Sequence, residues 1–187
     1  MARTPSNMVS LGSPMPKFRL QDVHEAWHSN DQESEAGTLV MFMSSHCPFV
    51  IHLKAHLAQL CTKYSGALTI FGIMSNDLDL YPQDGPEGMR ADIETYSYTF
   101  PYLLDETQAV AQSFQAACTP DFFLYDRQGR LYYRGQYDGS RPSNDVEVTG
   151  KDLEDAIKSL LKNQAPPTEQ MPSLGCNIKW KPENVPA

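Results

Sequence analysis

Thr38-Leu39-Val40-Met41-Phe42-Met43 is followed at once by Ser44-Ser45-His46-Cys47-Pro48, and this stretch decides the fold. Its first six residues form a continuous apolar run, which is typical of a strand buried on both faces of a sheet. Pro48 is favoured in the first turn of a helix, and apolar residues then recur on one helical face until Gly66. The stretch therefore predicts a central strand that leads directly into a helix, with Cys47 at the helix start.

The elements around this stretch predict an α/β fold. A second apolar run at 67–74 completes a strand–helix–strand unit, in which the two strands pair in parallel. Two further apolar runs flank Arg127-Gln128-Gly129, which is a strong hairpin signal. The other predicted elements are an edge strand at 17–20, a loop at 24–37, helices at 86–98 and 106–117, a short strand at 102–104 and a helix at 151–162. We therefore expect a central mixed sheet flanked by helices.

Proline content divides the chain into three parts. Residues 1–16 hold three prolines and predict an N-terminal arm. Residues 17–162 carry all the periodic segments and predict one α/β domain, as a chain of 187 residues allows. Residues 163–187 hold five prolines and little periodicity, so they predict an extended, proline-rich C-terminal tail.

Composition narrows the class of protein. The net charge is −8, from 23 acidic and 15 basic residues, which disfavours nucleic acid and anionic membranes as partners. Apolar runs stay below the roughly 18 residues that a membrane-spanning helix needs. Four cysteines are too few for a secreted disulfide scaffold of this size. We therefore expect a cytoplasmic protein whose cysteines are catalytic or inert rather than cross-linked.

Cys47 is the first candidate for chemistry. The free N–H groups and the positive dipole end of a helix N-terminus stabilise a thiolate, which is the reactive form of cysteine. The sequence therefore predicts thiol redox chemistry at an ionised sulfur that a substrate can reach.

Three segments resemble those of a known family: His46-Cys47-Pro48-Phe49-Val50, Cys118-Thr119-Pro120-Asp121-Phe122-Phe123-Leu124 and Gly175-Cys176-Asn177-Ile178-Lys179-Trp180. The chain resembles the thioredoxin-like superfamily, and within it the redoxin branch of alkyl hydroperoxide reductase/thiol-specific antioxidant proteins, over most of residues 17–180. The resemblance implies a thioredoxin-like fold in which Thr119-Pro120 is a cis peptide facing Cys47. It also implies that His46, Pro48, Thr119 and Pro120 line the substrate site.

Ser44 departs from the Cys-x-x-Cys motif of thioredoxin-like oxidoreductases. A serine cannot form a disulfide, so dithiol exchange between positions 44 and 47 is excluded. The Ser-x-x-Cys pattern instead resembles the Thr/Ser-x-x-Cys of peroxiredoxins, whose hydroxyl helps to hold a peroxide. The likeness is incomplete, because Val40 stands where that pattern has proline. Arg134 and Arg141 are the two candidates for a peroxide-activating arginine.

An oxidised Cys47 needs a second thiol, from this chain or from outside. Cys61 lies fourteen residues further along the predicted helix, about 21 Å away, whereas a disulfide needs Cα atoms within roughly 7 Å. Cys61 is therefore a core residue. Cys118, beside the predicted cis-proline, is either a partner of Cys47 or a buried packing residue. Cys176, in the tail, is either a resolving thiol or a structural neighbour of Trp180.

The leading hypothesis is a thiol peroxidase or related oxidoreductase, with Cys47 as the attacking thiol and Ser44, Cys118 and Cys176 as further catalytic candidates. Its partners are a small peroxide or disulfide substrate and an external thiol reductant, and a homodimer is possible. No cofactor or metal is expected; the i,i+4 pair His52 and His56 predicts only a solvated helix face. The acidic stretch from Asp77 to Glu87 likewise predicts a solvated loop. The alternatives are a non-enzymatic binding or scaffold protein and monothiol disulfide exchange.

Overall fold

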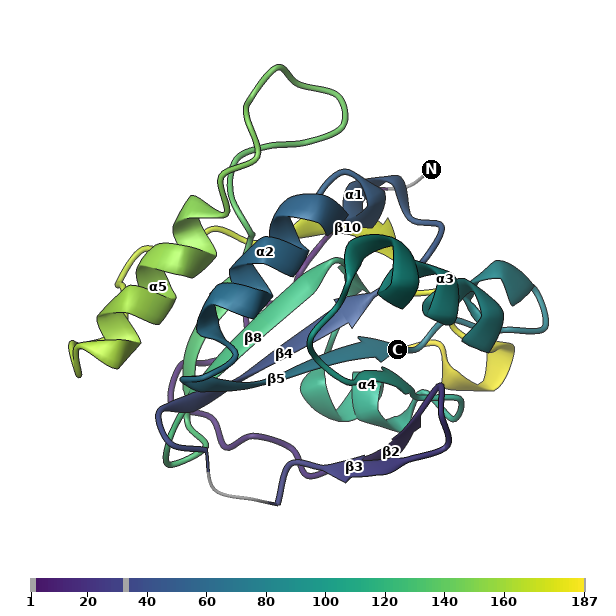
Figure 1. Cartoon of the computed structure of the whole chain (residues 1–187), viewed down its shortest axis with the longest axis horizontal. Coiled ribbons are helices and arrows are strands. Elements are labelled where there is room, and N and C mark those ends of the chain that lie inside the picture. Colours follow the sequence, from purple (N-terminus) through teal and green to yellow (C-terminus); the bar gives the residue numbers. More distant parts are fainter. Residues whose placement is uncertain (1–2, 32–33, 187) are drawn as a thin grey trace.

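A mixed seven-stranded sheet forms the centre of the computed structural model, which describes residues 3–31 and 34–186 (Figure 1). The strand order is β3-β2-β6-β5-β4-β8-β9. The strands are β2 (Arg19–Asp22), β3 (Trp27–Ser29), β4 (Gly37–Met43), β5 (Leu68–Met74), β6 (Tyr102–Leu104), β8 (Asp121–Asp126) and β9 (Leu131–Gly135). Because β4 pairs in parallel with β5 and antiparallel with β8, the predicted mixed sheet is confirmed.

Helices cover both faces of this sheet. They are α1 (Pro48–Ile51), α2 (Lys54–Tyr64), α3 (Pro86–Tyr96), α4 (Ala109–Phe114) and α5 (Lys151–Leu161), with short 3-10 turns η1 (Pro82–Asp84) and η2 (Pro182–Asn184). Alternate residues of β4 point to opposite faces, as strand geometry requires. Leu39 and Met41 join the core under α1, α2, α3 and α5, whereas Val40 and Phe42 join the core under α4. This two-sided burial explains the continuous apolar run, and the predicted α/β fold is confirmed.

The helix that follows Cys47 differs from the single helix predicted from the sequence. It is divided into α1 and α2 at His52 and Leu53. The N–H of Leu53 donates to the carbonyl of Val50, three residues back, at 2.9 Å, so the backbone tightens locally into a 3-10 turn. The apolar periodicity continues across the break, which is why the sequence pattern does not reveal it.

Two other predicted boundaries are wrong. The predicted loop at 24–37 contains β3, which pairs with β2 in a hairpin closed by the carboxylate of Asp22. The predicted helix at 106–117 is reduced to α4, because Gln108 adopts a left-handed conformation and Asp105 accepts the N–H groups of Val110 and Ala111. Both differences come from side-chain hydrogen bonds that periodicity does not register.

The predicted arm and tail meet in a second, smaller sheet. Strand β1 (Arg3–Pro5) pairs with β10 (Leu174–Asn177), and β10 pairs with β7 (Cys118–Thr119), both in antiparallel register. Part of the tail is thus a regular strand that docks on its own chain. Figure 1 shows β10 beside α1 at one end of the central sheet. The tail therefore reaches the helix start that carries Cys47.

Candidate functional site

Cys47 occupies the N-cap position of α1, and Pro48 is the first helical residue. The Thr119-Pro120 peptide bond is cis, as the family resemblance implied. The thiol of Cys47 donates to the carbonyl oxygen of Thr119 at 3.1 Å, so the cis-proline loop forms the wall opposite the helix start. Sequence reasoning placed these residues together, and the structure brings them into direct contact.

Cys47 is more buried than a reachable thiol should be. Only 1% of its surface is exposed, and β10 is packed beside α1. The expectation of an openly accessible sulfur is therefore wrong. Cys47 packs within the core cluster under α1 and α2, and its thiol has a polar contact with the carbonyl of Thr119.

Cys176 is a second cysteine at this site. It stands opposite Thr119 in the β10–β7 register, and the carbonyl of Thr119 accepts the thiol of Cys47, so the two cysteines meet at the same residue. Burial, and then the neighbouring Cys47, raise the pKa of Cys176 to about 12, so Cys176 stays a thiol. Gly175 makes the close approach possible, because a Cβ there would overlap the carbonyl oxygen of Thr119. The tail thus delivers a protonated thiol directly to Cys47.

Cys118 lies in a different environment. In the β10–β7 ladder it pairs with Asn177, so its side chain and that of Cys176 point to opposite faces. Its thiol donates to the carbonyl of Pro120 at 3.5 Å. Burial, followed by the nearby Asp121, raises the pKa of Cys118 well above its usual value. Cys61 is fully buried in the core, where burial raises its pKa to about 12.

The carboxylate of Asp84 organises the turn before Cys47. Its Oδ1 accepts the hydroxyl of Ser44 at 2.9 Å and the N–H groups of Ser45 and His46 at 2.7 and 3.3 Å. Its Oδ2 accepts the amide of Asn76 at 2.7 Å and lies 2.7 Å from His46 Nδ1, which places the imidazole proton on Nδ1. Asp84 is 0% exposed, and the hydrogen bonds from these five donors offset the free-energy cost of burying its side chain.

Ser44 is held within this network. Its hydroxyl donates to Asp84 and its oxygen accepts the N–H of Cys47 at 3.1 Å. The serine therefore fixes the backbone of the turn. His46 sits between two groups, since Asp84 binds its Nδ1 and its ring stacks on Tyr81 with centroids 5.4 Å apart.

Sequence reasoning missed Asp84, and the prediction of a solvated loop from Asp77 to Glu87 is wrong for its two buried members, Asp77 and Asp84. Asp84 is about forty residues from the turn it supports. The spacing of acidic residues in its loop does not indicate that one of them will bind a distant turn. His52 and His56 are half-buried on the helix face and contact the hydroxyls of Ser140 and Tyr137 at 2.7 and 2.6 Å, so they are less solvated than the prediction had them.

The two arginines considered for peroxide activation are engaged elsewhere. Arg134 donates to the carbonyl of Val9 and to the side chain of Gln170. Arg141 donates to the carbonyls of Asp138 and Ser140 and to a side-chain oxygen in its own loop. Neither has a hydrogen bond to the Cys47 site among the described residues.

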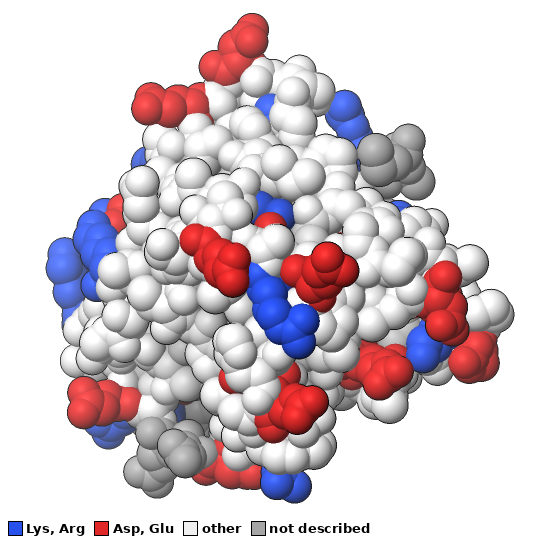
Figure 2. Space-filling view, turned by 45° about the vertical axis from the view of Figure 1, so that its right-hand side comes forward, with Lys and Arg blue, Asp and Glu red and all other residues white. Residues whose placement is uncertain are grey.

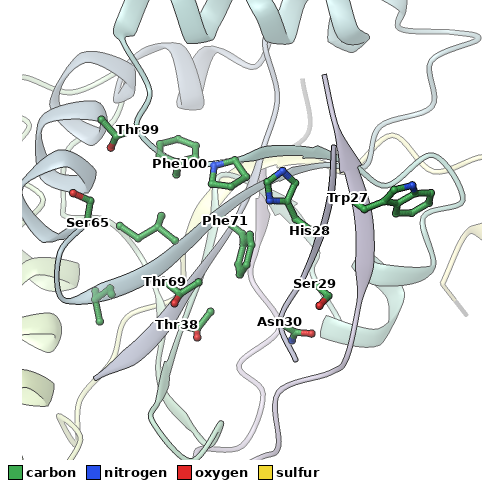
Figure 3. Close-up of a pocket in the computed structure, with 13 residues that line it drawn as sticks. Trp27, His28, Ser29, Asn30, Thr38, Ser65, Thr69, Phe71, Thr99 and Phe100 are labelled. Atoms are coloured by element: carbon green, nitrogen blue, oxygen red, sulfur yellow. The ribbon is translucent and has the colours of Figure 1, made fainter. Parts of the chain in front are cut away.

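A cavity of about 370 Å³ lies away from the thiols (Figure 3). It is lined by Thr38 at the start of β4, by residues 68–71 at the start of β5 and by side chains of β3. Cys47 follows the opposite end of β4, so this cavity is not part of the site.

Other features bear on the class of partner. On the face shown in Figure 2, acidic and basic side chains are interspersed and form no single basic surface. Within residues 3–31 and 34–186, no helix has the length and apolar character needed to cross a membrane. The same residues contain no cluster of three or more potential metal ligands from His, Cys, Asp and Glu.

A helix-start thiol that faces a cis-proline loop at the end of a parallel strand places this chain among the thioredoxin-like proteins. The AhpC/TSA family profile matches residues 11–134, and the chain belongs to that family. The comparison with curated proteins gave no match.

Solved structures extend the likeness over the whole chain. A hypothetical protein from Sinorhizobium meliloti 1021 is 43% identical, with a TM-score of 0.93 over 96% of this chain and 99% of that one. An uncharacterized conserved protein from Geobacillus kaustophilus is 44% identical, with a TM-score of 0.94 over 97% and 98%. The thioredoxin domain of a thiol-disulfide oxidoreductase from Bacteroides vulgatus is 18% identical, with a TM-score of 0.62 over 81% and 97%, and shares the fold. Family and fold together support thiol-dependent redox chemistry.

Proposed function

We propose that the protein is a thiol-dependent peroxidase in which Cys47 attacks a small hydroperoxide and Cys176 resolves the product. The observation that carries this proposal is the meeting of both cysteines at Thr119: the Cys47 thiol donates to its carbonyl, and Cys176 stands opposite it in the β10–β7 register. The near-complete burial of Cys47 supports a small substrate, since a bulky protein disulfide would have to displace β10 first.

The proposed reaction has three steps. The thiolate of Cys47 attacks the terminal peroxide oxygen, the O–O bond breaks, and the leaving alkoxide takes a proton to become an alcohol. The resulting sulfenic acid condenses with the thiol of Cys176, which forms the S–S bond and releases water. An external reductant, either one dithiol of thioredoxin type or two molecules of a glutathione-type monothiol, then reduces this disulfide by thiol–disulfide exchange and is itself oxidised to a disulfide.

The other candidate residues take supporting roles in this proposal. Ser44 fixes the turn through the N–H of Cys47, and Thr119 with Pro120 forms the opposite wall. Cys118 is a packing residue, because its side chain leaves the ladder on the face opposite Cys176.

Mass spectrometry of peroxide-treated protein tests the proposal. One equivalent of hydrogen peroxide should convert the reduced wild type into a Cys47–Cys176 disulfide. The C176S variant should stop at a Cys47 sulfenic acid that dimedone traps, whereas the matched control C118S should still form the disulfide. The proposal fails if Cys47 stays reduced, or if C118S abolishes the cross-link.

Disulfide exchange is the second candidate, and the engagement of Arg134 and Arg141 away from the thiols favours it. The same experiment with oxidised glutathione in place of peroxide separates the two. A Cys47–Cys176 disulfide that forms much faster with oxidised glutathione than with peroxide would support exchange as the main reaction.

A further inference from the structure

A cationic side chain near a thiol adds to the stabilisation that a helix N-terminus gives the thiolate, and Arg134 and Arg141 are engaged elsewhere. The tail offers another cation. Lys179 follows Cys176 by three residues, and Lys179 is among the charges that act on the Cys176 thiol, where it favours the ionised form.

The backbone of Lys179 is held by three hydrogen bonds. Its N–H donates to the side-chain oxygen of Asn76 at 2.8 Å. Its carbonyl accepts the N–H of Asp77 at 2.7 Å and the side-chain amide of Gln108 at 2.8 Å. Asn76 also binds Asp84, so one residue ties both Lys179 and the turn before Cys47 to the end of β5. The lysine is thus fixed relative to the thiols.

The side chain of Lys179 completes a short series of contacts. Its ammonium lies 5.6 Å from the centroid of the Tyr81 ring, which is a cation–π distance. The same ring stacks on His46, the residue before Cys47. Among the described residues, no carboxylate lies within ion-pair distance of Lys179, whereas the buried Lys54 is neutralised by Asp92 at 2.6 Å. The charge of Lys179 therefore remains available to the site.

We propose that Lys179 is the cationic residue of the thiol site, where its ammonium lies against Tyr81, the ring that also stacks on His46, and stabilises negative charge on Cys47. This inference rests on the proposed function, since it assigns the electrostatic partner of the same attacking thiolate. It makes the C-terminal segment the source of two groups, the resolving thiol and the cation.

Alkylation of Cys47 by one uncharged and one negatively charged reagent tests the inference, because a nearby cation speeds the reaction of the charged reagent. Iodoacetamide and iodoacetate attack the same sulfur, but only iodoacetate carries a negative charge. For unit charges about 10 Å apart at an effective dielectric of about 20 to 40, Coulomb's law gives a roughly four- to sixteenfold rate preference. Removing the cation in K179M should lower the iodoacetate-to-iodoacetamide rate ratio at Cys47 by about that factor, as followed by mass spectrometry of the Cys47 peptide.

Two matched variants accompany K179M. K179R keeps the charge and should keep most of the ratio. K181M removes one positive charge from the same segment, two residues further on, and should leave the ratio within about twofold of wild type, because none of the described side-chain contacts links Lys181 to the site. An unchanged ratio in K179M, or an equal fall in K181M, would overturn the inference. Formation of the Cys47–Cys176 disulfide with peroxide in wild type tests the proposed peroxidase, whereas the alkylation ratio tests the role of Lys179. Each proposal can therefore be refuted without the other.

Discussion

Replacing Asp84 by asparagine should destabilise the turn that carries the candidate nucleophile. The change keeps the shape of the side chain, but one carboxylate oxygen becomes an NH₂ group. Depending on its orientation, this NH₂ faces either the two donors now bound to Oδ2 or the three now bound to Oδ1. At least two buried donors therefore lose their acceptor.

The magnitude follows from that count. A buried donor left without a partner costs about 1–3 kcal/mol, so D84N should lose about 2–6 kcal/mol of unfolding free energy. A change of imidazole tautomer at His46 or a rotation of the Asn76 amide would recover part of this and favour the lower end. Such a loss is a large fraction of the roughly 5–15 kcal/mol that stabilises a typical protein.

Urea unfolding checks the prediction. With a slope of about 2–3 kcal/mol per molar, the midpoint of D84N should fall by about 0.7–3 M without a change of slope. D79N, an exposed aspartate in the same segment, is the control and should stay within about 0.5 kcal/mol of wild type. A D84N midpoint equal to that of D79N would refute the view that the buried carboxylate holds the turn.

Three further outcomes are expected. G175A should prevent the close approach of β10 to the cis-proline loop, so peroxide should no longer yield a disulfide to Cys176; normal cross-linking would contradict this. Burial raises the pKa of Asp121 to about 8, so the native state keeps a proton that the unfolded state loses. Wild type should therefore lose stability between about pH 4 and 8, and D121N should lose less, as urea midpoints at both pH values will show. Hydrogen bonds from Lys158 and Lys63 lower the pKa of Glu154 to about 2, so its contribution is present above about pH 4.5 and disappears as the pH falls toward 2. E154Q should show a smaller acid-induced drop in thermal midpoint than wild type.

Local pattern was sufficient for most of the fold and for the centre of the site. The apolar runs of β4 and β5, the hairpin of β8 and β9 and the helix start at Pro48 each follow from burial or backbone preference within a few residues. The boundaries that failed, at the α1–α2 break and at β3, depend on hydrogen bonds with no periodic signature.

The remaining site residues could not be predicted because they come from distant segments. Asp84 reaches the turn from a loop after β5, and Lys179 reaches Tyr81 from the C-terminal tail. Nothing in the spacing of an acidic loop or a proline-rich tail specifies which turn it will contact. Cys118 and Cys176 were both candidates in the sequence, with Cys118 favoured by its place beside the predicted cis-proline, and only the β10–β7 register placed their side chains on opposite faces.

The sequence by itself determined that a thiol would stand at a helix start after a buried strand, because helix and strand signals are local and Cys47 lies between them. Tertiary structure alone decided which groups surround that thiol. The docking of β10 buries Cys47, brings Cys176 to it and carries Lys179 to the same end of the sheet. These contacts join residues from about sixty to more than a hundred positions apart, so their geometry is set by chain packing and not by any short stretch of sequence.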